Sequence, residues 1–94
     1  MSDIHVLMTP TFRKSFKKLY KNQQEEVKKE IKKIVNDPGI GEEKKGDLNR
    51  VFVHKFKIDK QLTLLAYQFD PETRVLLMLG SHQNFYRNLK RVLS

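Results

Sequence analysis

Two amphipathic helical stripes occupy the first forty residues of the chain. The first stripe has apolar residues at positions i, i+4, i+7 and i+8, the spacing of one helical face: Phe12, Phe16, Leu19 and Tyr20. Thr9 and Pro10 come directly before it. Threonine is a good helix cap and proline is tolerated at the first helical position, so the pattern predicts a helix that starts at Pro10.

A second stripe predicts another helix directly after the first, with apolar positions Val27, Ile31, Ile34 and Val35. We expect it to open at Asn22, because Glu25 follows three residues later as in a capping box. The sequence Asp37-Pro38-Gly39 is a helix-stop signal. Since the link between the two stripes is short, the helices are expected to form an antiparallel hairpin.

The rest of the chain has the patterns of strands. Residues 4–9 are short and apolar and predict a first strand. Residues 51–58 alternate, with Lys55 and Lys57 on one face and Phe52, Phe56 and Ile58 on the other. Residues 62–69 are almost continuously apolar, which is typical of a central strand covered on both faces. Residues 75–79 form the last predicted strand.

Short turns at residues 59–61 and 70–73 favour antiparallel pairing of these last three strands. Residues 39–49 are rich in glycine and charge and predict a loop, which we interpret as a solvated connector rather than a functional lid. A third apolar stripe predicts a short C-terminal helix: Phe85, Leu89, Val92 and Leu93.

The order strand, two helices, three strands, helix predicts an α+β domain over residues 1–94. We expect an antiparallel sheet of about four strands, with the N-terminal helix hairpin packed on one face. The other face of the sheet would then remain available. The sequence contains no internal repeat that would suggest a second domain.

The composition narrows the classes of function. The formal net charge is +8, a field that attracts nucleic acid, anionic membranes or acidic proteins. The chain has no cysteine, which excludes disulfides, thiolate catalysis and cysteine-based zinc sites. No stretch has the length and apolarity of a membrane span, and no signal peptide is recognisable, so cytoplasmic localisation is the default expectation. The basic helices lack the apolar face that lipid binding needs.

The most informative segment is the end of the last strand. There the run Leu76-Leu77-Met78-Leu79 leads into Gly80-Ser81-His82 and then Tyr86-Arg87. A buried strand thus delivers a histidine, a tyrosine and an arginine to the start of a helix. With Lys55, Lys57 and Lys90 nearby on the predicted open face, these residues predict a basic patch.

Such a patch suits RNA cleavage without a metal or any other cofactor. The 2′-hydroxyl attacks its own phosphate, so the site needs an acid, a base and cations. His82 suits either proton role, because the unperturbed pKa of histidine is about 6.5. Tyr86 could transfer a proton or stack on a base. The three histidines lack metal-ligand spacing.

Each candidate also has a structural interpretation. His82 could cap the final helix, and Lys55 and Lys57 could be ordinary polar residues on a solvated face. Phe85 belongs to the apolar stripe and is expected in the core, whereas Tyr86 lies one position off it and is expected to be exposed. His54 alternates with the two lysines, so it should pack beside Phe52 and Phe56.

These segments together resemble the RelE/ParE superfamily of bacterial type II toxins. The resemblance covers nearly the whole chain and is carried by three segments in their order and spacing: Lys55-Phe56-Lys57, Leu64-Leu65-Ala66-Tyr67, and Leu79-Gly80-Ser81-His82 with Phe85-Tyr86. It implies an antitoxin partner, expected to be acidic because the chain is basic. The helix pair and an open sheet edge are the candidate docking surfaces.

The resemblance implies one of two activities that arrest growth. RelE-like members cut messenger RNA on the ribosome and so inhibit translation, whereas ParE-like members poison DNA gyrase without being nucleases. The His82 and Tyr86 ending is most similar to the YafQ-type nucleases, so ribosome-dependent cleavage is the favoured expectation. A third alternative is a toxin-fold relic or a plain nucleic-acid binder.

By position, the resemblance assigns Lys55 and Lys57 to RNA contact and places His82 and Tyr86 at the catalytic end. Arg87 and Lys90 would hold phosphate. The chain departs from RelE-like nucleases at Leu64, where they place a catalytic arginine. This departure weakens the nuclease case and leaves room for the gyrase alternative. Lys60 or Gln61, in the preceding turn, are candidates to compensate.

Overall fold

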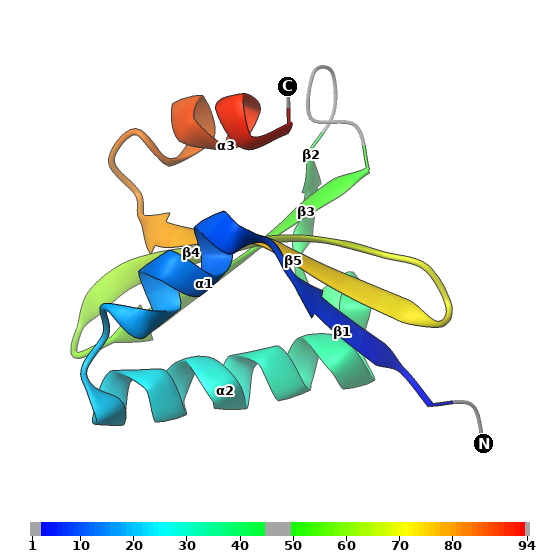
Figure 1. Cartoon of the computed structure of the whole chain (residues 1–94), viewed down its shortest axis with the longest axis horizontal. Coiled ribbons are helices and arrows are strands. Elements are labelled where there is room, and N and C mark those ends of the chain that lie inside the picture. Colours follow the sequence, from blue (N-terminus) through cyan, green and yellow to red (C-terminus); the bar gives the residue numbers. More distant parts are fainter. Residues whose placement is uncertain (1–2, 45–49, 94) are drawn as a thin grey trace.

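The computed structural model describes residues 3–44 and 50–93, and Figure 1 shows their arrangement. The elements, in chain order, are β1 (His5–Met8), α1 (Pro10–Lys17), α2 (Lys21–Asn36), a 3-10 turn η1 (Pro38–Ile40), β2 (Glu42–Lys44), β3 (Val51–Ile58), β4 (Gln61–Phe69), β5 (Thr73–Ser81) and α3 (Phe85–Leu93). The α+β class, the helix pair and the three consecutive antiparallel strands are confirmed.

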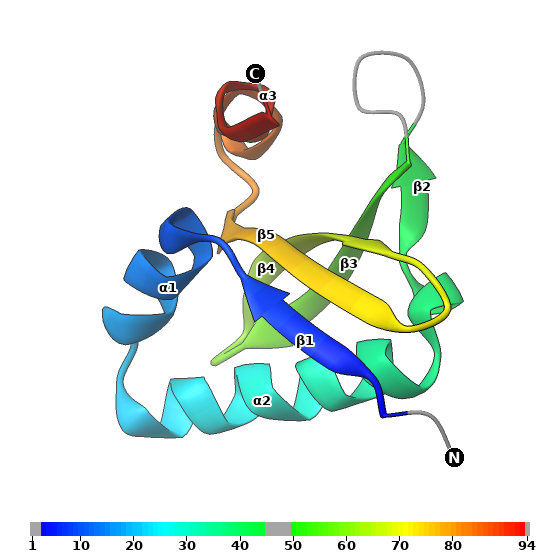
Figure 2. The same cartoon turned by 45° about the vertical axis from the view of Figure 1, so that its right-hand side comes forward.

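The sheet has five strands in the order β1-β5-β4-β3-β2. It is mixed rather than purely antiparallel, because β1 pairs with β5 in parallel. Figure 2 shows β1 beside β5 at one edge and β2 at the other. A parallel pair needs a crossover connection, and α1 and α2 with the strands that follow them supply it.

The helix pair packs on one face of the sheet, as predicted. Phe12, Val27 and Ile34 of α1 and α2 are fully buried against Leu65 and Tyr67 of β4. The even-numbered residues of β3 lie on this same face, where Ile58 belongs to the cluster and the rings of Phe52 and Phe56 pack against it. The hydrophobic stripe of each helix is therefore buried here.

The other face of the sheet is not open along its whole length, contrary to the expectation. The last helix, α3, covers part of it, and Figure 1 shows α3 and α2 on opposite sides of the strands. Phe85 and Leu89 pack against Val51, Val53 and the neighbouring strand residues. Burial of Phe85 is confirmed. The amphipathic stripe of α3 required such a partner surface.

Two details of the helix pair differ from the predictions. The second helix begins at Lys21, one residue before Asn22, and Gln23 rather than Glu25 accepts a hydrogen bond from the backbone N–H of the capping residue Tyr20, at 2.9 Å. The side chain of Tyr20 is 77% exposed and does not belong to the buried stripe. Since α1 ends at Lys17, the helical period that predicted its burial stops before reaching it.

The segment predicted as a loop, residues 39–49, contains a short strand. β2 pairs antiparallel with β3 through Glu42, Glu43 and Lys44, while residues 45–49 lie outside the described part of the chain. A three-residue polar edge strand has no hydrophobic alternation, which is why its pattern was that of a loop.

Buried polar side chains hold this framework together. His54 packs beside Phe56 as predicted, with 5.5 Å between ring centroids, and its Nε2 lies 2.7 Å from Oε1 of Glu30 on α2. Arg74 is 4% exposed. Its guanidinium donates to the carbonyls of Asp70, Thr73 and Val35, so it joins the C-terminal end of α2 to the β4–β5 hairpin.

Among the described helices, none is both long and apolar enough to cross a bilayer.

Candidate functional site

Four charged side chains of β2 and β3 share the sheet face on which α3 lies. Lys55 and Lys57 are exposed and alternate with Val51 and Val53, which contact α3. Residues opposite each other on neighbouring strands share a face, and Glu42 pairs with Val53 while Lys44 pairs with Val51. The predicted lysines therefore have two further charged neighbours, Glu42 and Lys44.

Lys44 connects this strand face to α3. Its Nζ lies 5.1 Å from the centroid of the Tyr86 ring, within cation–π range, and 3.0 Å from Oε1 of Glu42. The hydrogen bond to Glu42 raises the pKa of Lys44 above its ordinary value; burial opposes the rise, and Tyr86 adds to it. Lys44 is thus held as a cation over the aromatic ring.

Glu42 is fully ionised in this arrangement at neutral pH. The hydrogen bond and charge of Lys44, followed by the charge of Lys55, lower the pKa of its carboxyl group. Glu42 interacts with two cations of the face, Lys44 and Lys55. It holds Lys44 in place, and the face keeps a net positive charge because Lys44, Lys55 and Lys57 outnumber it.

Tyr86 is half-buried rather than exposed as expected. Its ring packs edge-on against Phe85, with 5.6 Å between centroids, and contacts the hydrophobic cluster under α3. One side of the phenol is therefore fixed by packing, and Lys44 lies against the ring.

His82 occupies an exposed turn between β5 and α3. Its backbone carbonyl accepts a hydrogen bond from the N–H of Phe85 at 3.3 Å, and Asn84 in the same turn has a positive φ of 60°. The backbone of His82 thus supports the start of α3, which leaves its imidazole available for another partner. Within residues 50–93, no hydrogen bond joins the side chains of His82 and Tyr86.

Arg87 and Lys90 lie on different sides of α3. Residues four apart are neighbours on a helix, so Lys90 stands one turn from Tyr86 on the same flank. Arg87 is two residues from each of the buried Phe85 and Leu89, which puts it on the outer side of the helix, away from the sheet. Both are exposed.

Leu64 is completely buried on the α3 side of β4, directly opposite Lys55 on β3. Gln61, an odd-numbered residue of β4, lies on the helix-pair side, where it lines a cavity with Ser15 and Lys18. Lys60 sits in the β3–β4 turn with a φ of 70°. Gln61 is therefore separated by the sheet from Lys55 and Lys57.

No group of three or more histidine, aspartate and glutamate side chains in the described ranges has the arrangement of a metal site. The chemistry that the α3 face offers is electrostatic. Lys44, Lys55 and Lys57 supply positive charge around a fixed phenol, and such charges stabilise a phosphate whose negative charge increases during a reaction.

Sequence reasoning missed Glu42 and Lys44. They lie in the charge-rich segment read as a loop. Three consecutive charged residues, Glu42, Glu43 and Lys44, are compatible with an edge strand, but their pattern does not distinguish a strand from a loop. Their proximity to Tyr86 depends on the sheet order.

Comparisons with known proteins agree with this fold. A family described as the ParE-like toxin of type II bacterial toxin–antitoxin systems matches residues 6–90. A free, doubly substituted Escherichia coli toxin RelE is 17% identical, with a TM-score of 0.72, covering 97% of this chain and 96% of that one.

Two toxin–antitoxin complexes are also similar. The Mycobacterium tuberculosis complex RelBE2 is 20% identical with a TM-score of 0.71, covering 85% of this chain and 99% of that one. The intact E. coli RelBE complex is 20% identical with a TM-score of 0.68, covering 85% and 98%. At these identities the likeness concerns the fold. No curated protein matched the chain.

Proposed function

The chain belongs to the ParE-like toxin family of type II bacterial toxin–antitoxin systems, and we propose that its toxic activity is ribosome-dependent cleavage of messenger RNA. The family supplies the general role of a toxin. The specific activity is inferred from the face that carries Lys44, Lys55, Lys57 and Tyr86, together with His82 in the turn that leads into α3.

The observation that carries the proposal is the fixed phenol among cations. Lys44 lies 5.1 Å from the ring of Tyr86, and the exposed Lys55 and Lys57 extend the positive charge along β3. A surface that only attracts polyanions needs no half-buried tyrosine among its lysines. An RNA-cleaving surface benefits from such a tyrosine, because one group must contact the nucleotide while cations neutralise the phosphate.

The proposed reaction is attack of a 2′-hydroxyl on the adjacent phosphorus, which forms a cyclic phosphate and releases the 5′-oxygen of the next nucleotide. A base removes the proton of the 2′-hydroxyl and an acid protonates the leaving oxygen. His82 takes one of these proton roles, and Tyr86 positions or protonates. Lys55, Lys57 and Lys90 hold phosphate, while Arg87 contributes to the general positive field. The reaction uses no metal or cofactor.

A second function is favoured by one specific observation. Leu64 is fully buried under α3, so the position that resembles the catalytic arginine of RelE-like nucleases holds an apolar core residue. A non-enzymatic DNA gyrase inhibitor needs no such arginine. That alternative predicts stalled gyrase on DNA, a DNA damage response and intact messenger RNA.

The proposed partner in either case is an acidic antitoxin. Complexes of similar folds with antitoxins are known, and a net charge of +8 favours an acidic binding segment. β1 is an edge strand with Leu7 55% exposed, so it could accept an added strand. The toxin would act in the cytoplasm, where ribosomes and messenger RNA are found.

Pulsed expression in a bacterial host, followed by primer extension on several translated messengers, tests the proposal. We expect new in-frame cuts that disappear in His82→Ala while the variant stays folded. Lys32→Ala, an exposed change on α2, is the control and should cut normally. Full toxicity of His82→Ala would remove His82 from the mechanism, and growth arrest with uncut messengers would favour gyrase.

A further inference from the structure

A cavity near the α1–α2 junction is lined by none of the side chains proposed for cleavage, Lys44, Lys55, Lys57, His82 and Tyr86. It has a volume of about 290 Å³ and lies where the α1–α2 junction meets the ends of β3, β4 and β5. Its apolar wall includes Ile58 and Leu79, which are 6% and 5% exposed, together with Leu62. The volume is close to the lower bound of about 300 Å³ for small-molecule pockets, so the cavity suits one planar group rather than a peptide segment.

Polar side chains surround this apolar wall without using their hydrogen-bonding capacity. Ser15, Lys18, Gln61 and Ser81 line the cavity. Within residues 3–44 and 50–93 their side chains have no hydrogen-bond partner. By contrast, Gln23 at the same rim already donates to Asp59, at 3.2 Å. The free groups include an amide, which both donates and accepts, and an ammonium.

The electrostatic surroundings favour a polyanion. The sequence has no acidic residue between Asp3 and Glu25, but it has five cations there: Arg13, Lys14, Lys17, Lys18 and Lys21. Asp59, which accepts a hydrogen bond from Gln23, is a single acidic residue against these five cations. A phosphate entering beside Lys18 therefore meets positive charge on the adjoining helix.

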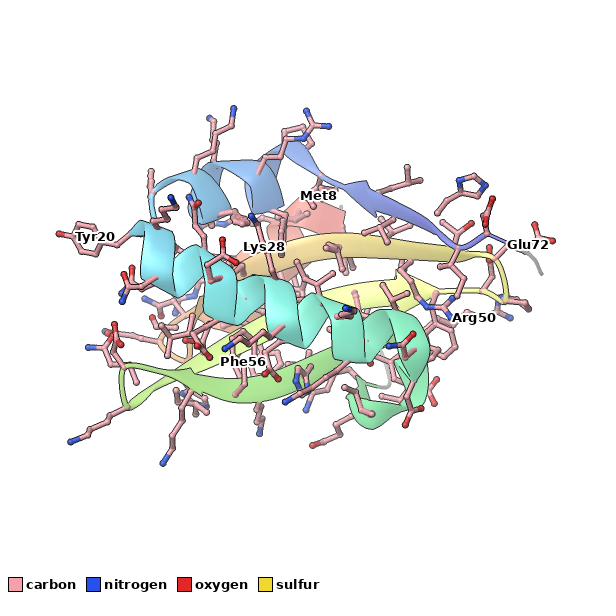
Figure 3. The ribbon with its side chains drawn as sticks, turned by 90° about the horizontal axis from the view of Figure 1, so that it is seen from below. Met8, Tyr20, Lys28, Arg50, Phe56 and Glu72 are labelled. Atoms are coloured by element: carbon pink, nitrogen blue, oxygen red, sulfur yellow. The ribbon has the colours of Figure 1, made fainter. Side chains whose placement is uncertain are left out.

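An exposed aromatic residue follows directly after a residue of the cavity wall. Tyr20 is 77% exposed and extends into solvent from the α1–α2 junction (Figure 3). Its neighbour Leu19 lines the cavity. Exposed tyrosine rings among cations are typical platforms for unstacked bases of single-stranded RNA.

We propose that this cavity binds one unpaired nucleotide of RNA, with the base against Ile58 and Leu79, Gln61 at the base edge and Lys18 at the phosphate. The cavity includes Ser81, the residue directly before His82. The nucleotide held there would therefore lie near the proposed cleavage turn. Only the identity of the RNA rests on the proposed function, because nucleotide binding can be measured without cleavage.

The test is a titration of the full chain with adenosine and uridine 5′-monophosphates, followed by amide chemical shifts in NMR spectra, with inorganic phosphate as the comparison probe. We expect saturable shifts centred on Ser15, Lys18, Thr63 and Ser81. Gln61→Ala should weaken nucleotide binding about fivefold, the usual effect of losing one hydrogen bond.

The matched charge variants are Lys18→Ala and Lys14→Ala. Both remove one cation from α1 or its C-terminal cap, but only Lys18 lines the cavity. Lys18→Ala should weaken binding at least about fivefold, as expected for a charged hydrogen bond, whereas Lys14→Ala should change it less than about twofold.

The inference would be overturned if Lys18→Ala and Lys14→Ala weakened nucleotide binding equally, or if inorganic phosphate shifted the amide signals as much as the nucleotides do. It would also be overturned if an antitoxin shifted the signals of the cavity residues and the nucleotides did not. The last result would assign the cavity to a protein partner. Nucleotide binding with uncut messenger RNA in cells would contradict the proposed nuclease but support this site, and cutting without nucleotide binding would do the reverse.

Discussion

At the scale of single residues, Tyr86 of α3 contacts a side chain from β2, an edge strand of the sheet. Lys44 lies 5.1 Å from the ring and is itself held by Glu42 at 3.0 Å. Its side chain is only 20% exposed, so solvent competes weakly for the ammonium. The sequence could predict Tyr86 as a candidate from its place after the last strand. It could not predict Lys44, whose contact requires β2 to lie against the α3 face.

The first prediction concerns this contact. Lys44→Met keeps the length of the side chain but removes its charge, so Tyr86 loses its cation and messenger cleavage should fall about tenfold, the upper range of a partly exposed cation–π contact. The control is Lys32→Met, which removes an exposed charge outside the face and should leave cleavage unchanged. Lys33→Met would not serve as a control, because Lys33 pairs with Glu30. Unchanged cleavage in Lys44→Met would assign Lys44 a purely structural role.

The second prediction concerns Tyr67, which is fully buried. Its hydroxyl donates to the carbonyl of Pro38 at 2.5 Å and accepts from the N–H of Gly41 at 3.0 Å, and burial raises its pKa. Tyr67→Phe leaves both backbone groups without this partner and should lower the free energy of unfolding by about 1–3 kcal/mol.

Urea denaturation measures this loss, with Tyr20→Phe as the control, because the exposed Tyr20 should change stability by less than about 0.5 kcal/mol. Equal stability of both variants would show that the Tyr67 hydroxyl does not fasten the η1 turn. Alanine at position 41 is a harsher change, since its Cβ would lie 2.6 Å from the hydroxyl of Tyr67.

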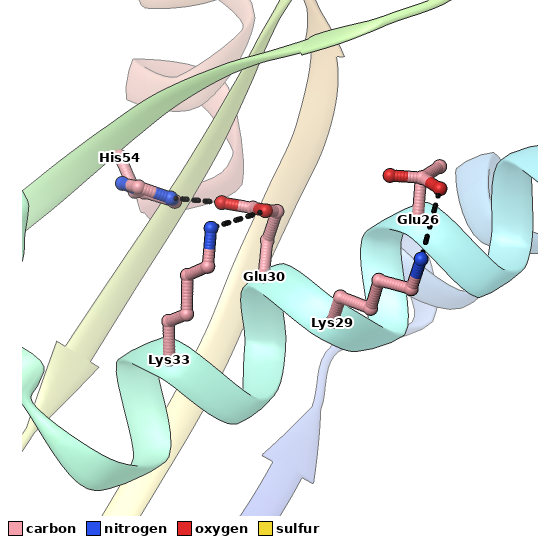
Figure 4. Close-up of polar contacts among 5 residues, drawn as sticks. All are labelled: Glu26, Lys29, Glu30, Lys33 and His54. Atoms are coloured by element: carbon pink, nitrogen blue, oxygen red, sulfur yellow. Dashed lines mark hydrogen bonds and ion pairs between the residues drawn. The ribbon is translucent and has the colours of Figure 1, made fainter.

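At the scale of elements, α2 is joined to β3 by a polar group of three residues, Glu30, Lys33 and His54, shown in Figure 4. Glu30 lies 2.7 Å from Nε2 of His54 and 3.0 Å from Nζ of Lys33. Burial is the largest influence on Glu30 and opposes ionisation, but the hydrogen bonds from His54 and Lys33 and their charges together lower its pKa below the ordinary value.

The third prediction follows from the sign of this shift. A carboxyl group with a lowered pKa in the folded state stabilises that state above its unfolded pKa of about 4.3, and this contribution disappears as the pH falls through the folded-state pKa. Glu30→Gln should therefore make the stability of the protein less dependent on acid pH. Thermal unfolding between neutral and acid pH measures the difference.

Glu26→Gln is the matched control on the same helix. Its ion pair with Lys29 is half-exposed at 3.3 Å and should contribute little. Identical acid dependence in wild type and Glu30→Gln would show that the Glu30–His54 pair does not join α2 to β3 in solution.

Most of these elements follow from local pattern. The burial of His54 beside Phe56 could be predicted because strand residues alternate between faces. The start of α1 follows from Thr9 and Pro10, and the end of α2 follows from Asp37. The parallel pairing of β1 with β5 could not, since it joins residues almost seventy positions apart, such as His5 and Thr73. The Tyr20 side chain was misplaced because helix periodicity does not reveal where a helix ends.

At the scale of the whole molecule, the charge of +8 is unevenly spread. One concentration of cations surrounds α1, where no acid occurs between Asp3 and Glu25, and another follows residue 73, where the sequence is again free of acids. The two concentrations adjoin, because Thr11 and Ser15 of α1 and Phe85 and Asn88 of α3 line one cavity. A long RNA could contact both, whereas an acidic segment of a partner could neutralise either.

The fourth prediction concerns this field. Association of the toxin with a single-stranded RNA should slow at least about tenfold when salt rises from about 50 to 500 mM, because screening weakens long-range attraction. Stopped-flow fluorescence with a labelled RNA measures the association rate. A rate independent of salt would show that the concentrated charge does not guide RNA to the surface. Since DNA binding would have the same dependence, this result does not distinguish a nuclease from a gyrase inhibitor.

The central claim is that the α3 face cleaves messenger RNA on the ribosome. The most direct measurement combines purified toxin, purified ribosomes and one defined messenger with a codon in the A site, and maps the RNA ends. The account predicts cuts that require the ribosome and are lost in His82→Ala. An uncut messenger, with gyrase supercoiling blocked by the same toxin preparation, would contradict it.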